Sequence, residues 1–334
     1  PALAVASAGY LEHVAPLGAG GRRIAALAFL ALLVTVNVLG TRGSVRVLGA
    51  ATAIKVGVIV LLVLVLPFSG TGLQAVEQPW PADWSSGTLA AVGPAVSAVR
   101  WSYGGWQFST FVVGEVVEPQ RQFPRGLVLG TAALVVIYLA ANLAYLAGLG
   151  PIRMAASERV AAEAVETTLG AGAARLVAVA VLISMLSAAQ MIVLTSSRVL
   201  FAMGRDGVFF SGLGRVHPRF GTPAIAIVAI GAWAAVLAMS GTFKTLLTYV
   251  VFVGWIFYGL GASAVFVFRR TRPDTPRPFR VPGYPVTPAL FVLAAVFLVG
   301  NTIINQPKPS LLALGGTLLG VPVYLLWKRS GGRR

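Results

Sequence analysis

Residues 92–125 read VGPAVSAVRWSYGGWQFSTFVVGEVVEPQRQFPR. They begin as an apolar run long enough to cross a bilayer, which Gly104-Gly105 interrupts between aromatic residues. Glycine loses more backbone entropy in a helix than any other residue, and in lipid no water replaces an opened helical hydrogen bond. A helix broken at this depth is tolerated mainly where it lines a cavity inside the protein. Paired glycines also serve close helix packing, so this stretch alone leaves both interpretations open.

The composition indicates an integral membrane protein. The 334 residues are 57% hydrophobic and 11% charged, with a mean hydropathy of +0.83, whereas a soluble domain carries roughly 25% charged residues. The net charge of +16 comes from arginines in short loops between apolar runs, so we expect no nucleic-acid partner. With no cysteine and two histidines, we expect no disulfide, metal centre or cofactor.

Apolar runs along the chain predict a single all-α transmembrane domain over residues 1–334. A helix needs about 20 apolar residues to cross the bilayer core. We expect a partial span at 1–14, and residues before Pro1 that belong to the same protein. The complete predicted spans cover residues 24–41, 45–68, 92–114, 125–148, 174–200, 222–240, 244–268, 287–304 and 309–327.

The distribution of basic residues predicts the orientation. Most arginines lie in one set of alternate loops, which includes residues 198–221 and 269–280. The positive-inside rule places these loops and the C-terminus in the cytoplasm of a multi-pass protein of the cell (inner) membrane. For the loop 198–221 we expect a short helix and contact with anionic lipid.

Residues 157–169 predict a short amphipathic helix on the opposite side. Ser157 is the expected N-cap and Gly170 the expected stop. Such a helix lies over a vestibule or along the membrane surface. The expected apolar face consists of Val160, Ala161, Ala164, Val165, Thr168 and Leu169.

Several segments, taken in order, resemble a known family. They are WSYGGWQF, GEVVEPQRQFPRGLVLG, VVIYLAANLAYL, SSRVLFAMGRDG, HPRFGTPAIAI and RPFRVPGYP. The chain resembles amino-acid permeases of the amino acid–polyamine–organocation superfamily, especially L-type transporters and bacterial alanine–serine–cysteine exchangers. The resemblance implies two inverted five-helix repeats plus two further helices, without the first two helices and most of the third. It assigns 1–14 to the end of the third helix, 24–68 to helices four and five, 92–268 to the second repeat with helices six to ten, and 287–327 to helices eleven and twelve.

The resemblance also implies a substrate site at the interrupted run. In the family, free carbonyls here accept the substrate's α-ammonium group, and they correspond to Trp101, Ser102 and Gly104. Trp101 stands where phenylalanine usually covers the bound amino acid, although Trp101 and Trp106 also fit simple packing aromatics. The carboxylate half of the site would lie in the missing first helix. The expected substrate-binding residues are Trp101, Ser102, Tyr103, Gly104, Gly105, Gln107 and Trp255.

Lys55 lies inside a predicted span, where a charge is costly and usually functional. Relatives hold a lysine here in place of the sodium ion of sodium-coupled members, which implies sodium-independent transport. A lysine that reaches back to the membrane surface is the alternative. A proton-coupled role also stays open.

Predictions also concern three further polar residues. Glu115 follows Gly114 at the end of the interrupted run and is either part of an inner gate or simply solvated. Asn142 and Gln190 are isolated polar residues in spans, for which hydrogen bonds between helices are the usual role.

The resulting prediction is a secondary active or facilitative transporter of neutral amino acids that works by alternating access. We expect sodium-independent exchange or uptake, an amino-acid substrate, a surrounding lipid bilayer and no disulfide-linked subunit. The alternative is a permease of the same fold for polyamines, cationic amino acids or another solute, with proton coupling as one option. An enzyme is not expected, because His13 and His217 lie at span ends and no catalytic cluster lies within a span.

Overall fold

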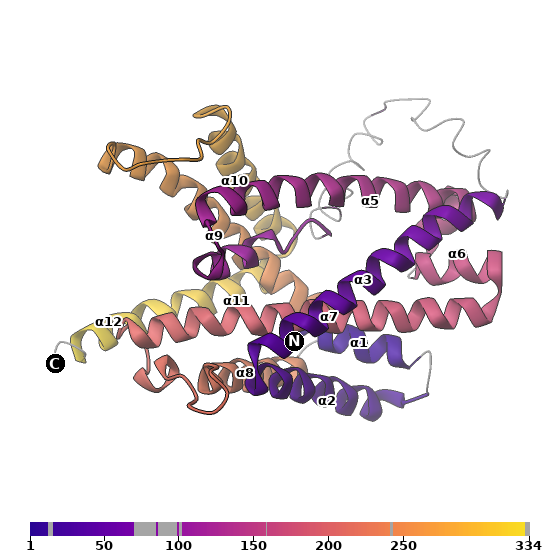
Figure 1. The fold of residues 1–334 in the computed structure, drawn as a ribbon, viewed down its shortest axis with the longest axis horizontal. Helices are drawn as coiled ribbons and strands as arrows, with labels where there is room; N and C mark the ends of the chain where they lie inside the picture. The colour runs from indigo at the N-terminus through magenta and orange to yellow at the C-terminus, as the bar shows by residue number, and fades with distance from the viewer. Residues whose placement is uncertain are drawn as a thin grey trace.

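Helices make up the described part of the chain, which contains no strand (Figure 1). The computed structural model describes residues 1–12, 16–69, 85, 99, 102–157, 159–240 and 243–330. Within them, seven helices are long and apolar enough to cross a membrane. The α-helices are α1 (Ala2–Leu11), α2 (Gly18–Leu39), α3 (Thr41–Val65), α5 (Pro119–Ala156), α6 (Val160–Leu169), α7 (Ala171–Arg205), α8 (Ala224–Ser240), α9 (Phe243–Thr271), α10 (Val286–Asn305), α11 (Pro307–Leu318) and α12 (Gly320–Ser330). The 3₁₀ helices are η1 (Leu66–Ser69), η3 (Trp106–Glu115) and η4 (Ser211–Gly214).

Helix α7 is the central element of the bundle. It packs against α1, α2, α3, α6, α8 and η3, and in Figure 1 it runs between α5 on one side and α1 and α2 on the other. Its buried positions include small and polar residues such as Ser187, Ala189 and Ser197. Small side chains let neighbouring helices approach α7 from several directions.

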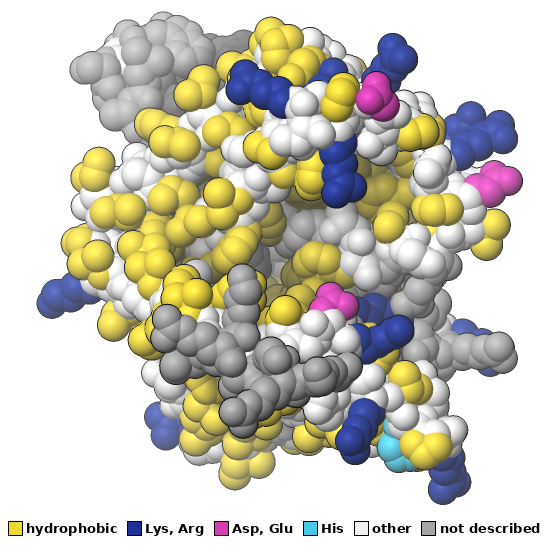
Figure 2. Space-filling view, turned by 90° about the vertical axis from the view of Figure 1, so that its left-hand side faces the viewer, with side chains coloured by type: hydrophobic (Ala, Val, Ile, Leu, Met, Phe, Trp, Pro, Cys, Tyr) yellow, Lys and Arg dark blue, Asp and Glu magenta, His cyan; other side chains and the backbone are white. Residues whose placement is uncertain are grey.

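The other long helices turn apolar side chains outward. Leu293, Val296 and Phe297 of α10, for example, are all exposed. Figure 2 shows apolar side chains over much of one face of the molecule. Exposed apolar surface on this scale is typical of a protein whose solvent is lipid, and it agrees with the predicted membrane spans.

A close helix contact joins α2 to α8. A Cβ added to Gly231 would lie 2.2 Å from Cγ2 of Val34, so any larger residue would displace the Val34 side chain. Next to this contact, Ala4, Leu30 and Ala234 form a small buried cluster. The contact brings the N-terminal helices against the second half of the chain.

Helix α6 is more deeply packed than its sequence predicted. Ala164 and Val165 are buried in a cluster with Leu62, Leu66 and residues of α5 and α7. Leu169 is exposed, so the predicted apolar face was wrong at that end.

The predicted cap of α6 was also wrong. The N-cap residue is Arg159, and no side chain caps the helix. The Ser157 hydroxyl instead accepts a hydrogen bond from the Arg159 N–H at 3.1 Å, which forms a turn ahead of the helix. The predicted stop at Gly170 is confirmed, with φ 85°.

Most predicted spans correspond to helices, with shifted ends. Helix α5 begins at Pro119, ahead of the predicted 125, because its polar first turn lies outside the apolar run. The span 309–327 is divided into α11 and α12 around Leu319. In the loop 198–221 the short helix is the 3₁₀ turn η4. Of the span 92–114, only Val99 and residues from Ser102 onward are described, and Trp106–Glu115 is 3₁₀ rather than α-helical.

Candidate functional site

The predicted interruption is present in the structure. Residues 103–105 form a turn, and the 3₁₀ helix η3 follows it. Gly105 has φ 118° and ψ −23°, a left-handed conformation that side chains with a Cβ rarely adopt. The Gly105 N–H donates to Oε1 of Gln107 at 2.9 Å. Gln107 therefore satisfies a backbone group that the interruption leaves open.

Side chains of η3 also hold it in the 3₁₀ form. The Ser109 hydroxyl donates to the Trp106 carbonyl, and the Thr110 hydroxyl donates to the Gln107 carbonyl at 2.6 Å. Such bonds to the carbonyl three residues earlier compete with the α-helical pattern. A 3₁₀ run of 10 residues is unusual, and 3₁₀ segments inside a span often mark a hinge.

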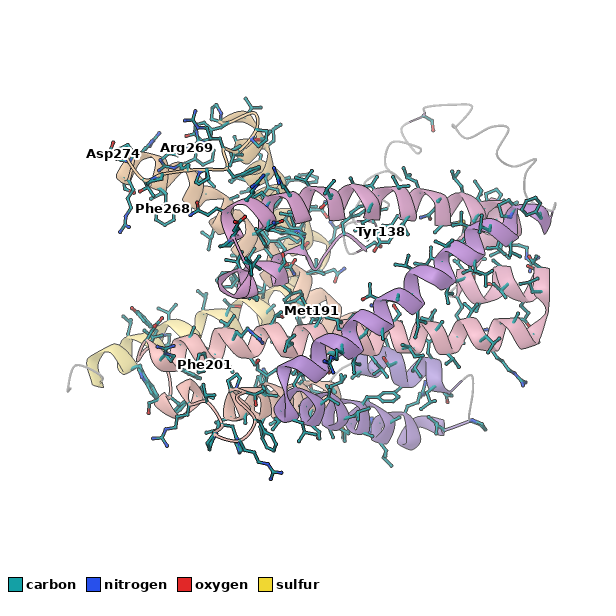
Figure 3. The ribbon with its side chains drawn as sticks, viewed as in Figure 1. Tyr138, Met191, Phe201, Phe268, Arg269 and Asp274 are labelled. Carbon is teal, nitrogen blue, oxygen red and sulfur yellow. The ribbon has the colours of Figure 1, made fainter. Side chains whose placement is uncertain are left out.

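Helix α5 contacts the interruption through Tyr138, which Figure 3 labels. The Tyr138 hydroxyl donates to the Ser102 carbonyl at 2.9 Å. The Tyr138 and Tyr103 rings meet edge to face with centroids 5.3 Å apart. The Ser102 carbonyl, predicted to be free, thus already has one donor, although a carbonyl oxygen can accept a second.

A chain of aromatic rings links the interruption to α9 and α10. Trp106 packs on Tyr258 with ring centroids 5.7 Å apart. Tyr258 meets Trp255 edge to face at 5.8 Å, and Trp255 stacks on Phe291 at 5.7 Å. The predicted site residue Trp255 is therefore connected to the interruption through two intervening rings.

Lys55 lies on the inner face of α3. Ala51 and Leu62, four residues before and seven after it, are both buried, while Ile54 and Val56 on either side are exposed. Positions with this spacing share one helix face, and α3 packs against α7. Lys55 itself is half-buried. This placement argues against a lysine on the lipid-facing side of α3.

Gln190 is a buried amide in the middle of α7. It is 2% exposed, and neither Oε1 nor Nε2 has a hydrogen-bond partner among the described residues. Burying an amide without a partner costs free energy, so such groups are rare in native structures. The predicted hydrogen bond to another helix is therefore wrong for Gln190. It is wrong for Asn142 too, whose Nδ2 donates to the Tyr138 carbonyl of its own helix at 2.8 Å.

The roles of Trp101 and Glu115 stay predictions. Trp101 lies outside the described residues. Glu115 ends η3, and Val116 beyond it is extended. Among the described residues, no group of three or more His, Asp or Glu side chains could hold a metal ion.

The sequence analysis missed three aromatic residues around the interruption and along the chain of rings that leads from it. Tyr138, Tyr258 and Phe291 come from three different helices. Tyr138 and Tyr258 share one signal, a polar hydroxyl within an apolar span. A tyrosine hydroxyl within a span needs a hydrogen-bond partner, and this signal could have identified Tyr138.

Comparison with known proteins places these observations in a family context. A family profile described as "Amino acid permease" matches residues 4–324. The mouse large neutral amino acids transporter small subunit 2 is 29% identical over 309 residues, which are 92% of this chain and 58% of that protein. The mouse b(0,+)-type amino acid transporter 1 is 28% identical over 291 residues, 85% of this chain and 58% of that protein.

A third relative is the amino acid transporter protein 6 of Caenorhabditis elegans. It is 31% identical over 261 residues, 77% of this chain and 49% of that protein. The chain thus spans about half the length of the curated relatives that it matches. By their descriptions, these relatives are transporters and not enzymes.

Proposed function

Because this chain belongs to the amino acid permease family, we propose that it carries neutral amino acids across a lipid bilayer by alternating access. The observation that supports this most is the turn with left-handed Gly105 that precedes the 3₁₀ helix η3, which packs against the apolar helices α5 and α7. Interrupted helices near the middle of a membrane form the substrate sites of many secondary transporters. Here the interruption is held by Gln107 from within and by Tyr138 from α5.

The carbonyl groups at the interruption are the proposed acceptors for the substrate's α-ammonium group. Trp101, Ser102 and Gly104 are the proposed positions, with Tyr103, Gly105 and Gln107 shaping the backbone around them. Tyr138 orients the Ser102 carbonyl and leaves its second lone pair for the substrate. Trp255 and Tyr258 supply an aromatic wall. Where a helix is interrupted inside a membrane protein, some carbonyl groups lose their backbone N–H donors. The substrate's ammonium group would donate to these carbonyls instead.

A neutral substrate fits the charges of the described spans. Their interiors contain no Asp or Glu. Glu115 is the last residue of η3, Glu118 precedes α5, and Glu163 and Glu166 belong to the short α6. A cationic side chain within the membrane needs an acidic partner. Polyamines and cationic amino acids are therefore the second candidates.

Lys55 is the proposed substitute for a coupling sodium ion. Its half-buried position on the face of α3 toward α7 supports this role. Transport would then be sodium-independent exchange or uptake. The distribution of basic loops supports a cytoplasmic C-terminus in the cell (inner) membrane, and we propose that no disulfide-linked subunit is attached through this cysteine-free chain.

Uptake into liposomes tests the proposed function. The intact protein, purified and reconstituted, is expected to accumulate at least one labelled neutral amino acid in a saturable way. Liposomes preloaded with unlabelled substrate distinguish exchange from uniport. A protein that carries putrescine or lysine, and no neutral amino acid, would favour the second candidates.

The hydrogen bond of Tyr138 predicts a moderate change in substrate affinity. Tyr138→Phe keeps the ring beside Tyr103 and removes the bond to the Ser102 carbonyl. A hydrogen bond contributes about 0.5–1.5 kcal/mol, so we expect KM for a neutral amino acid to rise about threefold. Uptake kinetics measure this, with Tyr324→Phe on the exposed surface of α12 as the control. An unchanged KM in both variants contradicts the role of Tyr138.

The buried amide of Gln190 predicts opposite effects on stability and transport. We propose that Gln190 pairs with the interrupted segment at another stage of the transport cycle, since α7 packs against η3. Gln190→Leu removes an unpaired buried amide that costs about 1–3 kcal/mol, so the thermal unfolding midpoint is expected to rise while uptake falls. Asn37→Leu, which replaces a buried amide on α2, is the control and is expected to leave uptake unchanged. Higher stability with full uptake would show that Gln190 has no part in transport.

A further inference from the structure

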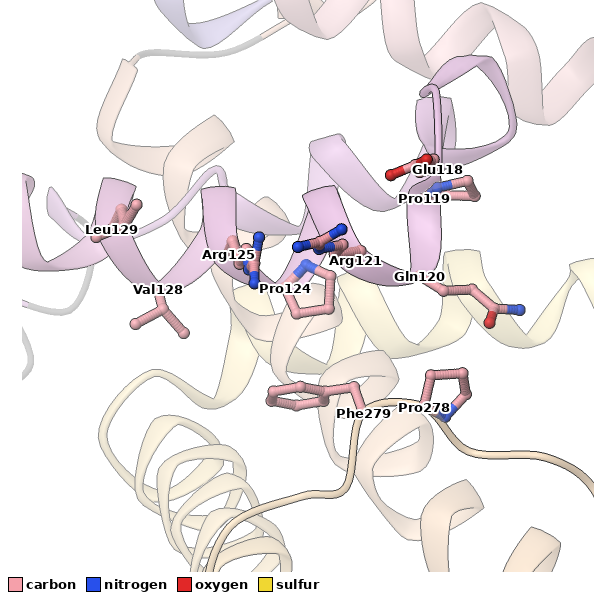
Figure 4. A pocket seen from close by; sticks show the side chains of 10 residues that line it. All are labelled: Glu118, Pro119, Gln120, Arg121, Pro124, Arg125, Val128, Leu129, Pro278 and Phe279. Carbon is pink, nitrogen blue, oxygen red and sulfur yellow. The ribbon is translucent and has the colours of Figure 1, made fainter.

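A groove lies between the beginning of α5 and the segment that follows α9. Its volume is about 1110 Å³, and Figure 4 shows the side chains that line it. Pro124 of α5 stands on one side, and Pro278 and Phe279 stand on the other. The groove is at the N-terminal end of α5, which is long and apolar enough to cross a membrane, so we expect the groove at a membrane–water boundary.

Two arginines supply the charge of the groove. Arg121 and Arg125 are four residues apart on α5, so they project from the same helix face. Neither guanidinium has a salt bridge or a hydrogen bond to a described residue. Glu118 also lines the groove at its edge, which leaves an excess of positive charge. The first turn of α5 adds the positive end of a helix dipole.

Other arginines nearby have structural roles instead. The Arg277 guanidinium donates to the carbonyls of Pro273 at 2.7 Å, Thr275 at 3.0 Å and Phe268 at 3.1 Å. The Arg269 guanidinium lies 3.7 Å from the centroid of the Tyr284 ring. Figure 3 shows Phe268, Arg269 and Asp274 together at this end of α9. These contacts hold residues 268–277, which lead directly to Pro278 and Phe279 on the wall of the groove.

The apolar lining continues along the outside of α5. Val128 and Leu129 line the groove and are exposed. Val136, Leu139 and Leu143 follow further along the helix and are exposed as well. The guanidinium pair therefore stands at the end of an apolar track that is long enough for an acyl chain. A small soluble anion would use the arginines but not this track.

We propose that the groove binds one anionic phospholipid, with its phosphate at Arg121 and Arg125 and its acyl chains along the exposed face of α5. Guanidinium groups match phosphate geometry by paired hydrogen bonds. Basic groups near the cytoplasmic surface attract anionic headgroups. The site is also close to the proposed transport machinery, because only residues 116–118 separate η3 from α5.

Lipid selectivity of the purified protein tests this proposal. Native mass spectrometry in neutral detergent, with equal amounts of phosphatidylglycerol and phosphatidylcholine, measures which lipid stays bound. The wild-type protein is expected to retain phosphatidylglycerol with about tenfold preference, equivalent to about 1.4 kcal/mol. The double variant Arg121→Gln/Arg125→Gln is expected to lose that preference.

A second double variant controls for net charge. Arg270→Gln/Arg272→Gln removes the same charge from exposed side chains outside the groove and is expected to keep the preference. If the first double variant does not purify, Arg121→Gln and Arg125→Gln alone are each expected to lower the preference about threefold. If both double variants lose the phosphatidylglycerol preference equally, the proposal is overturned, because the preference would then depend on net charge and not on the groove.

Soluble glycerol phosphate tests the contribution of the apolar track. An excess of it is expected to leave bound phosphatidylglycerol in place. Full displacement by glycerol phosphate would show that the groove recognises a free phosphate compound, and the lipid proposal would fail. A wild-type protein without lipid preference, or one that retains a polypeptide in the groove, would contradict it equally.

Discussion

Replacing Gly105 with alanine is expected to lower amino-acid uptake about tenfold or more. Gly105 has φ 118°, and a residue with a Cβ held in such a region costs about 1–3 kcal/mol. A Cβ at Gly105 would meet no atom within 4 Å, so the effect comes from the backbone and not from a clash. Relief of the strain would change the direction of the chain at the backbone carbonyls that are proposed to bind the substrate.

Gly114→Ala is the matched control for this prediction. Gly114 lies in the same 3₁₀ helix and has no left-handed backbone, and a Cβ added there would also meet no atom within 4 Å. We expect its uptake to stay within about twofold of wild type, as for most exposed substitutions. The thermal unfolding midpoint of both variants shows whether lost uptake reflects misfolding. If Gly105→Ala and Gly114→Ala show the same uptake, the proposed role of the interruption in transport is contradicted.

Lys55→Met is expected to abolish most transport without loss of stability. A charge at membrane depth costs about 2.5–3.5 kcal/mol, so its removal relieves a cost while it eliminates the proposed sodium substitute. Lys55→Met removes the ammonium group that is proposed to act between α3 and α7. We therefore expect uptake to fall by more than about tenfold. Uptake and thermal unfolding of the same preparation measure both effects.

Two further measurements make the Lys55 prediction specific. Lys308→Met removes an exposed lysine and is expected to leave uptake unchanged. Replacement of sodium by choline is expected to leave wild-type uptake unchanged. A strict sodium requirement would remove the proposed role of Lys55 and leave the transport function intact.

The sequence predicted the spans well because apolar composition alone determines them. The runs that became α2, α3, α8, α9 and α10 were identified from length and hydropathy. Gly104-Gly105 by itself left close helix packing and an interrupted helix both open, because paired glycines suit either. The family resemblance decided for the interruption. Family assignment was also accessible, since ordered motifs extend over most of the chain.

Long-range contacts explain what the sequence could not predict. Ser102 and Tyr138 are 36 residues apart, and no local pattern indicates that they meet. Helix α6 looked like a surface helix because its alanines give a weak apolar signal. Only its position beside Leu66 and α7 makes Ala164 and Val165 part of a core.

The most direct test of the proposed site compares a neutral amino acid with its α-hydroxy analogue in liposome uptake. The proposed carbonyl acceptors recognise the α-ammonium group, which the analogue replaces with a hydroxyl. We predict saturable uptake of the labelled amino acid, competition by other neutral amino acids, and no competition by the α-hydroxy acid. Equal competition by the α-hydroxy acid, or no uptake of any neutral amino acid, would contradict the central claim.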